Sequence, residues 1–277
     1  MFRTLKLGLL ATATALSAPI AAAELMIAPT RVVLEQGERS AELILVNKGA
    51  EQGAYRISLE NRRMLLDGSM EEASEALEGE QFADDFVRFS PRRAVLEPEG
   101  RQTVRISANT SGLEPGEYRS HLRIMGAPTS AGRTLSEATS DAGDEISIEL
   151  IAIRSITIPV IVRVGDLDAE VVIESAATAP SDEEGETILA ARFKRTGGAS
   201  TYGDIQVFVD GQKEPVYFAR GIAIYTPNTE RDVMLPMPTE IAKTLEGKEV
   251  RIAYVSSNPA NPRLISEVTT VVGQSDS

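Results

Sequence analysis

Residues 146–162 read ISIELIAIRSITIPVIV, and every even-numbered position in this run is apolar except Arg154. Alternation of this kind is typical of a β-strand, in which successive side chains point to opposite faces. At about 3.3 Å per residue the run could reach on the order of 55 Å, whereas a typical strand has about 5 to 6 residues. The run therefore predicts one unusually long strand that protrudes, bends or serves two domains.

Shorter strand-like segments, separated by turn residues, lie on both sides of this run. Those before it are Arg31–Leu34, Ala41–Val46, Tyr55–Leu59, Phe86–Phe89, Arg101–Ser107 and Tyr118–Ile124. Those after it are Ala169–Ile173, Thr187–Phe193, Ile205–Val209, Val216–Ile224, Arg231–Pro236, Lys248–Tyr254 and Leu264–Val272, with a short helical turn expected over 238–245. Evenly spaced strands of this size predict an all-β chain.

The division into domains follows from a linker-like segment, Gly165–Asp168. We expect an immunoglobulin-like β-sandwich over residues 24–164 and a second β-sandwich over residues 165–277.

Two stretches interrupt the strand pattern. Residues 66–85 are acidic and rich in Glu and Ala, which predicts a short helix or an exposed loop, and residues 126–144 are rich in small residues, which predicts an exposed loop.

The first residues have the pattern of a secretory signal peptide. Arg3 and Lys6 precede an apolar stretch that ends in Ala21, Ala22 and Ala23, so cleavage is expected before Glu24 and residues 1–23 would be removed. The rival interpretation, a transmembrane anchor, needs roughly 20 apolar residues, and this stretch is shorter. The pattern predicts export.

Charge and cysteine content narrow the classes of partner. The net charge is −13, and loss of residues 1–23 makes it −15, which disfavours nucleic acid and anionic membranes as partners. There is no cysteine, so disulfides, thiol nucleophiles and cysteine-bound metals are excluded.

No motif in the sequence supports catalysis. The single histidine, His121, lies in a predicted strand, where a packed structural histidine is more common than a general base. Nucleophile elbows, phosphate-binding glycine loops and metal-ligand spacings do not occur. We expect a protein that is not an enzyme and that carries no cofactor and no metal.

Three motifs, in order, resemble the periplasmic chaperones of chaperone–usher pilus assembly. They are Pro29–Leu34 followed by Ala41–Asn47; Phe89–Pro98 followed by Arg101 and Val104–Ile106; and Gly116–Leu122 followed by Ile158–Arg163. The resemblance extends through about residue 165 and is much weaker beyond it. In this family the residue pair that matches Ser90–Pro91 often has a cis peptide bond.

The resemblance implies two immunoglobulin-like domains in an L or boomerang arrangement, a periplasmic location, pilin-like subunits as partners and delivery of these subunits to an outer-membrane usher. Such chaperones donate a strand to an incomplete subunit, with alternate apolar side chains filling the open groove. Here these side chains would be Ile146, Ile148, Leu150 and Ala152, although the same alternation also fits packing into the chain's own core.

The resemblance also implies an anchor for the terminal carboxylate of the subunit. Arg31 matches the family's cleft arginine, but the position of the family's lysine is taken by Pro159, which has no charge. Arg154 or Arg163 could take the place of that lysine.

Two other classes of function remain open at this stage. One is an exported immunoglobulin-like adaptor or structural protein that binds a folded partner or another copy of itself. The other is a hydrolase that uses His121.

Overall fold

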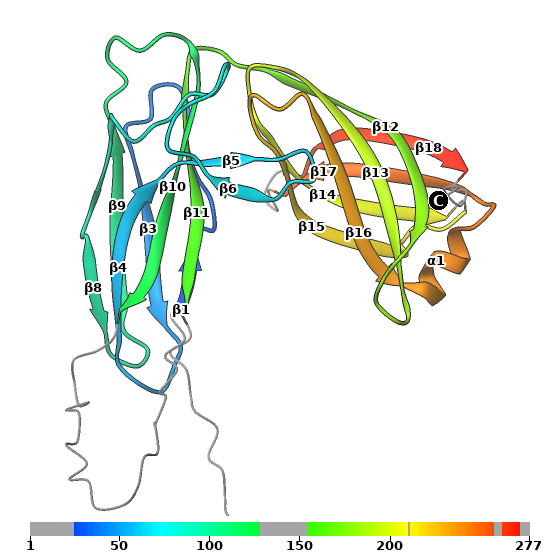
Figure 1. The fold of residues 1–277 in the computed structure, drawn as a ribbon, viewed down its shortest axis with the longest axis horizontal. Helices are drawn as coiled ribbons and strands as arrows, with labels where there is room; N and C mark the ends of the chain where they lie inside the picture. Colours follow the sequence, from blue (N-terminus) through cyan, green and yellow to red (C-terminus); the bar gives the residue numbers. More distant parts are fainter. Residues whose placement is uncertain (1–24, 128–153, 210, 258–261, 272–277) are drawn as a thin grey trace, which may run out of the picture.

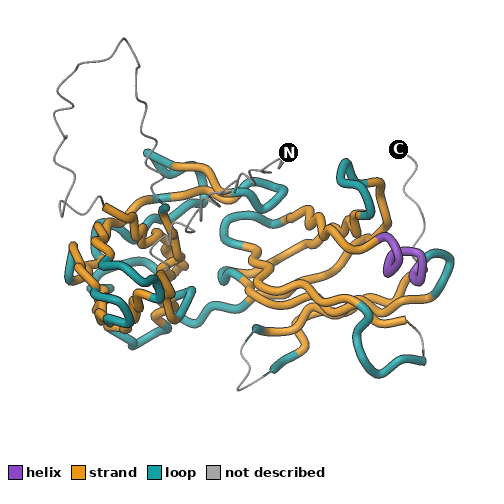
Figure 2. Tube along the Cα trace, turned by 90° about the horizontal axis from the view of Figure 1, so that it is seen from below, coloured by secondary structure: helices purple, strands orange, loops and turns teal. Residues whose placement is uncertain are grey.

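The computed structural model describes residues 25–127, 154–209, 211–257 and 262–271. The chain is all-β and forms two β-sandwiches that lie at an angle to each other, as an L (Figures 1 and 2). The predicted fold class is therefore confirmed. The expected signal peptide and residues 128–153 lie outside the described residues.

The first sandwich contains two sheets. One has the strand order β1 (Leu25–Ala28), β3 (Ser40–Asn47), β9 (Arg101–Ala108) and β7 (Val87–Ser90). The other has the order β2 (Val32–Leu34), β11 (Ser155–Val164), β10 (Gly116–Ala127), β4 (Gly53–Glu60) and β8 (Arg93–Leu96). All pairs are antiparallel except β2 with β11, which is parallel.

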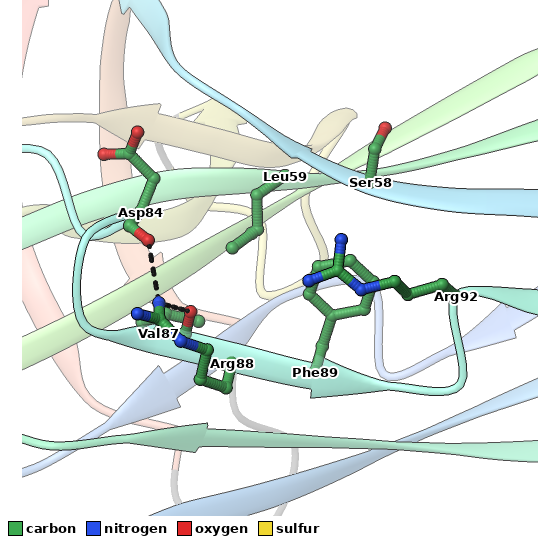
Figure 3. A pocket seen from close by; sticks show the side chains of 7 residues that line it. All are labelled: Ser58, Leu59, Asp84, Val87, Arg88, Phe89 and Arg92. Carbon is green, nitrogen blue, oxygen red and sulfur yellow. Dashed lines mark hydrogen bonds between the residues drawn. The ribbon is translucent and has the colours of Figure 1, made fainter.

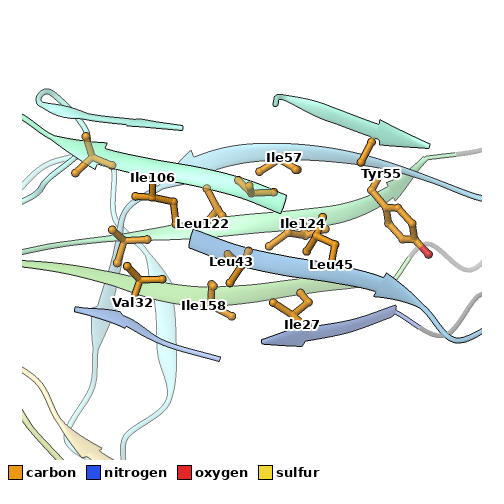
Figure 4. Close-up of a cluster of buried hydrophobic side chains, with 14 of the residues drawn as sticks. Ile27, Val32, Leu43, Leu45, Tyr55, Ile57, Ile106, Leu122, Ile124 and Ile158 are labelled. Carbon is orange, nitrogen blue, oxygen red and sulfur yellow. The ribbon is translucent and has the colours of Figure 1, made fainter. Parts of the chain in front are cut away.

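Alternate apolar side chains of both sheets form the first core (Figure 4). From β11 the inward residues are Ile158, Val160 and Val162, each almost fully buried. This part of the long run therefore packs into the chain's own core. Residues on the odd positions of β11 point out of the sandwich.

A hairpin leaves the first sandwich between β4 and β7. Its strands are β5 (Arg62–Met64) and β6 (Met70–Glu72), and it extends toward the second sandwich (Figure 1). Within residues 66–85, for which a short helix or an exposed loop is expected, Met70–Glu72 form a strand, and most of the remaining residues are exposed loop as expected. The residues that follow are also not all exposed, because Ala73 and Ala83 are buried.

The second sandwich consists of a three-stranded and a four-stranded sheet. The first has the order β12 (Ala169–Pro180), β13 (Glu186–Gly197) and β16 (Glu230–Pro238). The second has the order β15 (Tyr217–Ile224), β14 (Thr201–Val209), β17 (Glu249–Ser256) and β18 (Leu264–Val271). The predicted helical turn is confirmed as α1 (Thr239–Leu245). Phe193 and Tyr254 meet edge to face in this core, with ring centroids 5.5 Å apart.

The Ser90–Pro91 peptide bond is cis, as the resemblance implies. In the described part of the chain, no helix is long and apolar enough to cross a membrane.

Leu122 is fully buried on β10, so we expect its truncation to destabilise the fold strongly. Leu122→Ala should lower the free energy of unfolding by about 2 to 5 kcal/mol, because it removes apolar contacts and leaves a cavity. Urea unfolding followed by circular dichroism measures this. Val95→Ala on β8, where the side chain is 63% exposed, is the control and should change stability by about 0.5 kcal/mol or less. Equal effects of the two substitutions would contradict this description of the core.

Candidate functional site

Strand β11 has one edge that is only partly paired. Along its whole length, from Ser155 to Val164, it pairs with β10. On its other side only Val160–Val162 pair with β2. In the described part of the chain, the N-terminal half of β11 therefore presents backbone groups on this edge without a strand neighbour. Such an edge can accept an added strand through main-chain hydrogen bonds.

The predicted strand-donating residues Ile146, Ile148, Leu150 and Ala152 lie just before this edge, outside the described residues. Arg154 is described and exposed, and its carbonyl oxygen accepts a hydrogen bond of 3.0 Å from the backbone nitrogen of Gly126. The β10–β11 ladder therefore continues at least one residue before β11 begins.

Arg31 lies beside Pro159, at the C-terminal end of this partly paired edge. The register pairs Val32 with Val160, so the residues before them are also neighbours. On the other side of β11, Pro159 is opposite His121 of β10. Because Val32 and Val160 point into the core, Arg31, Pro159 and His121 share the outer face of the sheet, which faces the second sandwich.

Two tyrosines of the second sandwich enclose the Arg31 guanidinium. Its central carbon lies 4.5 Å from the ring centroid of Tyr202 and 5.5 Å from that of Tyr225, distances typical of cation–π contacts. Nη1 of Arg31 is buried and has no hydrogen-bond acceptor among the described residues. The predicted anchor residue is thus in the corner between the sandwiches, and it has unused hydrogen-bonding capacity.

A second arginine, Arg119 of β10, also joins the sandwiches. It is 5% exposed, its guanidinium carbon lies 4.4 Å from the Tyr225 ring centroid, and Nη1 donates a hydrogen bond of 3.0 Å to the carbonyl oxygen of Thr226. Burial lowers the pKa of Arg119. Burial also raises the pKa of Tyr225, so the ring facing both arginines is a neutral phenol.

Arg163 is one of the two expected substitutes for the lysine, and its guanidinium donates hydrogen bonds at the junction of the sandwiches. Its Nε donates to a carboxylate oxygen of Glu117 at 3.0 Å and its Nη2 to the carbonyl oxygen of Ser200 at 2.9 Å. Its Nη1 donates to Glu35 at 2.9 Å. The Glu117 side chain is fully buried and also accepts hydrogen bonds from the backbone nitrogen and hydroxyl of Ser200.

Arg154, the other expected substitute, lies five residues before Pro159 on the strand. At about 3.3 Å per residue this is a separation of roughly 16 Å from the row that contains Arg31. Arg154 also has an even number, like the inward Ile158 and Val160, so its side chain leaves the strand on the face opposite to that of Arg31. The geometry therefore does not support Arg31 and Arg154 as a shared anchor.

Nothing in the described part of the chain resembles a metal centre, because no three His, Cys, Asp or Glu residues are grouped to hold an ion. A surface hollow of about 270 Å³ lies between β4 and β7 and is lined by Leu59, Phe89, Arg88 and Asp84, among others (Figure 3). In it, Arg88 donates hydrogen bonds to the backbone carbonyl oxygens of Asp84, at 3.2 Å, and Val87, at 2.8 Å. Its guanidinium therefore has a structural role.

The sequence prediction missed the tyrosines, Arg119 and the β5–β6 hairpin. Tyr202 and Tyr225 belong to the second sandwich, for which the sequence offered no specific motif. Only the folded arrangement shows that these rings face Arg31.

His121 generates a prediction for the pH dependence of stability. The side chain is 3% exposed, and burial, together with the charges of Arg119 and Arg62, lowers its pKa to about 3. In the unfolded chain the pKa is about 6.5, so the unfolded state binds a proton first as the pH falls. The contribution of neutral His121 to the free energy of unfolding has its full value above pH about 6.5 and decreases progressively toward pH about 3.

Between pH 7 and pH 5 this loss should be about 2 kcal/mol. His121→Gln removes the titrating group, so the unfolding free energy of this variant should fall less than that of the unchanged protein by about this amount. Urea titrations at both pH values measure the difference. The same decrease in both proteins would show that His121 is not a buried neutral group.

Several solved structures that are similar to this chain are chaperones of fimbriae. One is the CsuC–CsuE chaperone–tip adhesion subunit pre-assembly complex of archaic Csu pili from Acinetobacter baumannii, at 12% identity and a TM-score of 0.49. That match covers 92% of this chain and 100% of the other. Another is the Pseudomonas aeruginosa CupB2 chaperone, at 14% identity and a TM-score of 0.47, with 90% and 100% covered.

The YadV chaperone is similar at 13% identity and a TM-score of 0.47, with 89% of this chain and 99% of that chain covered. No family model matches the chain, and no curated protein matches it. The similarity to these solved structures, at 12% to 14% identity, is one of fold alone.

Proposed function

We propose that this protein is a periplasmic chaperone that binds pilin-like subunits by adding its long strand, residues 146–162, to them. It then delivers the bound subunit to an outer-membrane usher. The observation that carries the proposal is the partly paired edge of β11, which ends beside Arg31 in the corner between the sandwiches.

Strand addition explains the length and alternation of the run. A subunit strand that pairs with the open edge gains main-chain hydrogen bonds over Ser155–Pro159 and over the residues before them, except at the nitrogen of Pro159. The side chains of Ile146, Ile148, Leu150 and Ala152 would fill the subunit's open groove. Within β11 the same alternation serves the chaperone's own core through Ile158 and Val160. The same strand would thus place side chains first in the subunit's groove and then in the chaperone's own core.

Arg31 would hold the terminal carboxylate of the subunit. Its buried Nη1 lacks an acceptor among the described residues, and a carboxylate would supply a charge-assisted hydrogen bond there. Pro159 provides no second cation. Arg154, at the far end of the open edge, would instead contact another acidic group of the subunit.

Substitutions on the strand and at the anchor test this proposal. Ile148→Asp or Leu150→Asp should reduce capture of pilin-like subunits by roughly 10-fold or more, because each puts a charge into an apolar groove. Arg31→Ala should also reduce capture, and Arg31→Lys should restore only part of it, since lysine lacks the planar, stacking guanidinium. Co-purification from the periplasm followed by mass spectrometry measures capture.

Val172→Asp is the matched control, because Val172 is 61% exposed on the second sandwich. It should leave capture unchanged. Unchanged capture by the Ile148, Leu150 and Arg31 variants would reject the proposal. Recovery of a folded envelope protein in place of small subunits would favour the adaptor function.

A further inference from the structure

The β5–β6 hairpin, Arg62–Glu72, occupies the corner between the sandwiches. Its turn is closed by hydrogen bonds of 2.9 Å from the Leu65 nitrogen to the Ser69 carbonyl oxygen and from the Gly68 nitrogen to the Leu65 carbonyl oxygen. In Figure 1 it crosses from the first sandwich to the near end of the second. The hairpin belongs to the first domain by sequence, yet its two methionines pack in a cluster with residues of both sandwiches.

Met64 and Met70 are the side chains that fill this corner. Met64 is 5% exposed, and both methionines pack in a cluster that joins the two domains. The other members of the cluster are Val33 and Ile161 from the first sandwich and Tyr202, Ala223 and Tyr225 from the second. Tyr202 and Tyr225 are the same rings that enclose Arg31. The hairpin is therefore packed against the walls of the Arg31 site.

Besides the methionine cluster, the hairpin meets the second sandwich at Arg231, whose guanidinium lies against Gly68, and through two hydrogen bonds. The Asn228 side-chain nitrogen donates to the Met64 carbonyl oxygen at 3.0 Å, and the Asp232 backbone nitrogen donates to the Leu66 carbonyl oxygen at 2.8 Å. Leu65 and Leu66 at the tip are 39% and 46% exposed. A two-stranded hairpin has marginal stability alone, and methionine side chains repack easily.

The base of the hairpin is held by the first sandwich. Arg63 donates two hydrogen bonds of 2.7 Å to the Glu80 carboxylate, whose side chain is 5% exposed. The Ala73 nitrogen donates to the Asn61 carbonyl oxygen at 2.9 Å, and Asn61 also accepts a hydrogen bond from the Ser120 hydroxyl. The base is thus attached to the first sandwich independently of the contacts that the tip makes with the second.

The buried Nη1 of Arg31, which has no acceptor among the described residues, points to a role for the hairpin. A buried donor without an acceptor is unfavourable, and more so when the group is charged. An acceptor that arrives at Nη1 would remove this cost, and the two tyrosines beside Arg31 pack in one cluster with the methionines of the hairpin. We propose that the β5–β6 hairpin is an autoinhibitory cover for Arg31, and that the C-terminal carboxylate of a bound polypeptide reaches Arg31 by displacing Met64 and Met70. The identity of this ligand rests on the proposed chaperone function.

A reversible disulfide tests the cover directly. The chain has no cysteine, so Leu66→Cys with Asp232→Cys introduces one defined pair. The backbone hydrogen bond between these residues places their Cα atoms within the range that a disulfide spans, about 4.4–6.8 Å. Oxidation fixes the hairpin on the second sandwich, and reduction releases it in the same protein.

The readout is the rate at which phenylglyoxal modifies Arg31, measured by mass spectrometry. We expect the oxidised form to react at least roughly 5-fold more slowly than the reduced form, because modification requires local opening. Arg101 is the internal control, since it is exposed on β9, away from the corner, and should react equally in both forms. Equal rates at Arg31 in the two forms would overturn the proposal.

The carboxylate part of the proposal is tested with N-acetylvaline, which carries a minimal C-terminal carboxylate. It should protect Arg31 from phenylglyoxal in the reduced form and not in the oxidised form, and N-acetylvalinamide should protect in neither. Protection that is independent of the disulfide, or no protection at all, would overturn the displacement. Failure of subunit capture, with these reactivity differences intact, would count against the proposed function alone.

Discussion

The arrangement of the two sandwiches depends on one buried carboxylate, that of Glu117. A buried charge is tolerated only when it is paired and hydrogen-bonded, and Glu117 meets this condition with groups from both domains: Arg163, Ser200 and Thr226. Because Glu117 is on β10 and Arg163 on β11, the pair of strands that bears the junction also bears the candidate binding edge. The orientation of that edge toward the second sandwich is thus fixed by the same ionic network.

This geometry gives the corner an unusual electrostatic character. Arg31 and Arg119 lie against tyrosine rings of the second sandwich, and His121 stays neutral beside Arg119. The aromatic faces stabilise the guanidinium groups without neutralising them, so the positive charge is retained in a poorly solvated place. A site of this kind favours an anion that arrives together with an apolar polypeptide, since the polypeptide can exclude water as it binds.

The sequence was sufficient for the parts of the fold that alternation determines. Strands such as β3, β9 and β10 follow from their apolar period, since each places alternate apolar side chains in the core between the two sheets. β8 was missed because Arg93–Leu96 contains only two inward residues, Ala94 and Leu96. The β5–β6 hairpin was missed because Met64 and the partly buried Met70 pack against residues of the second sandwich, and no local pattern encodes such contacts. Arg31 came from the resemblance to chaperones, but its tyrosine neighbours belong to a domain without recognisable motifs.

The pairing of β10 with β11 has a mechanical consequence. The two antiparallel strands are joined over ten residue pairs, from Gly116 with Val164 to Met125 with Ser155. When the N-terminal end of β11 is pulled and the first sandwich is held through β10, the force acts parallel to the strands and loads these hydrogen bonds together, in shear. The opposite end of the pair is held at Glu117 and Arg163, where the second sandwich begins. The molecule is therefore built to resist a pull along its long strand, and to yield more readily to a force that peels an added strand away from the edge.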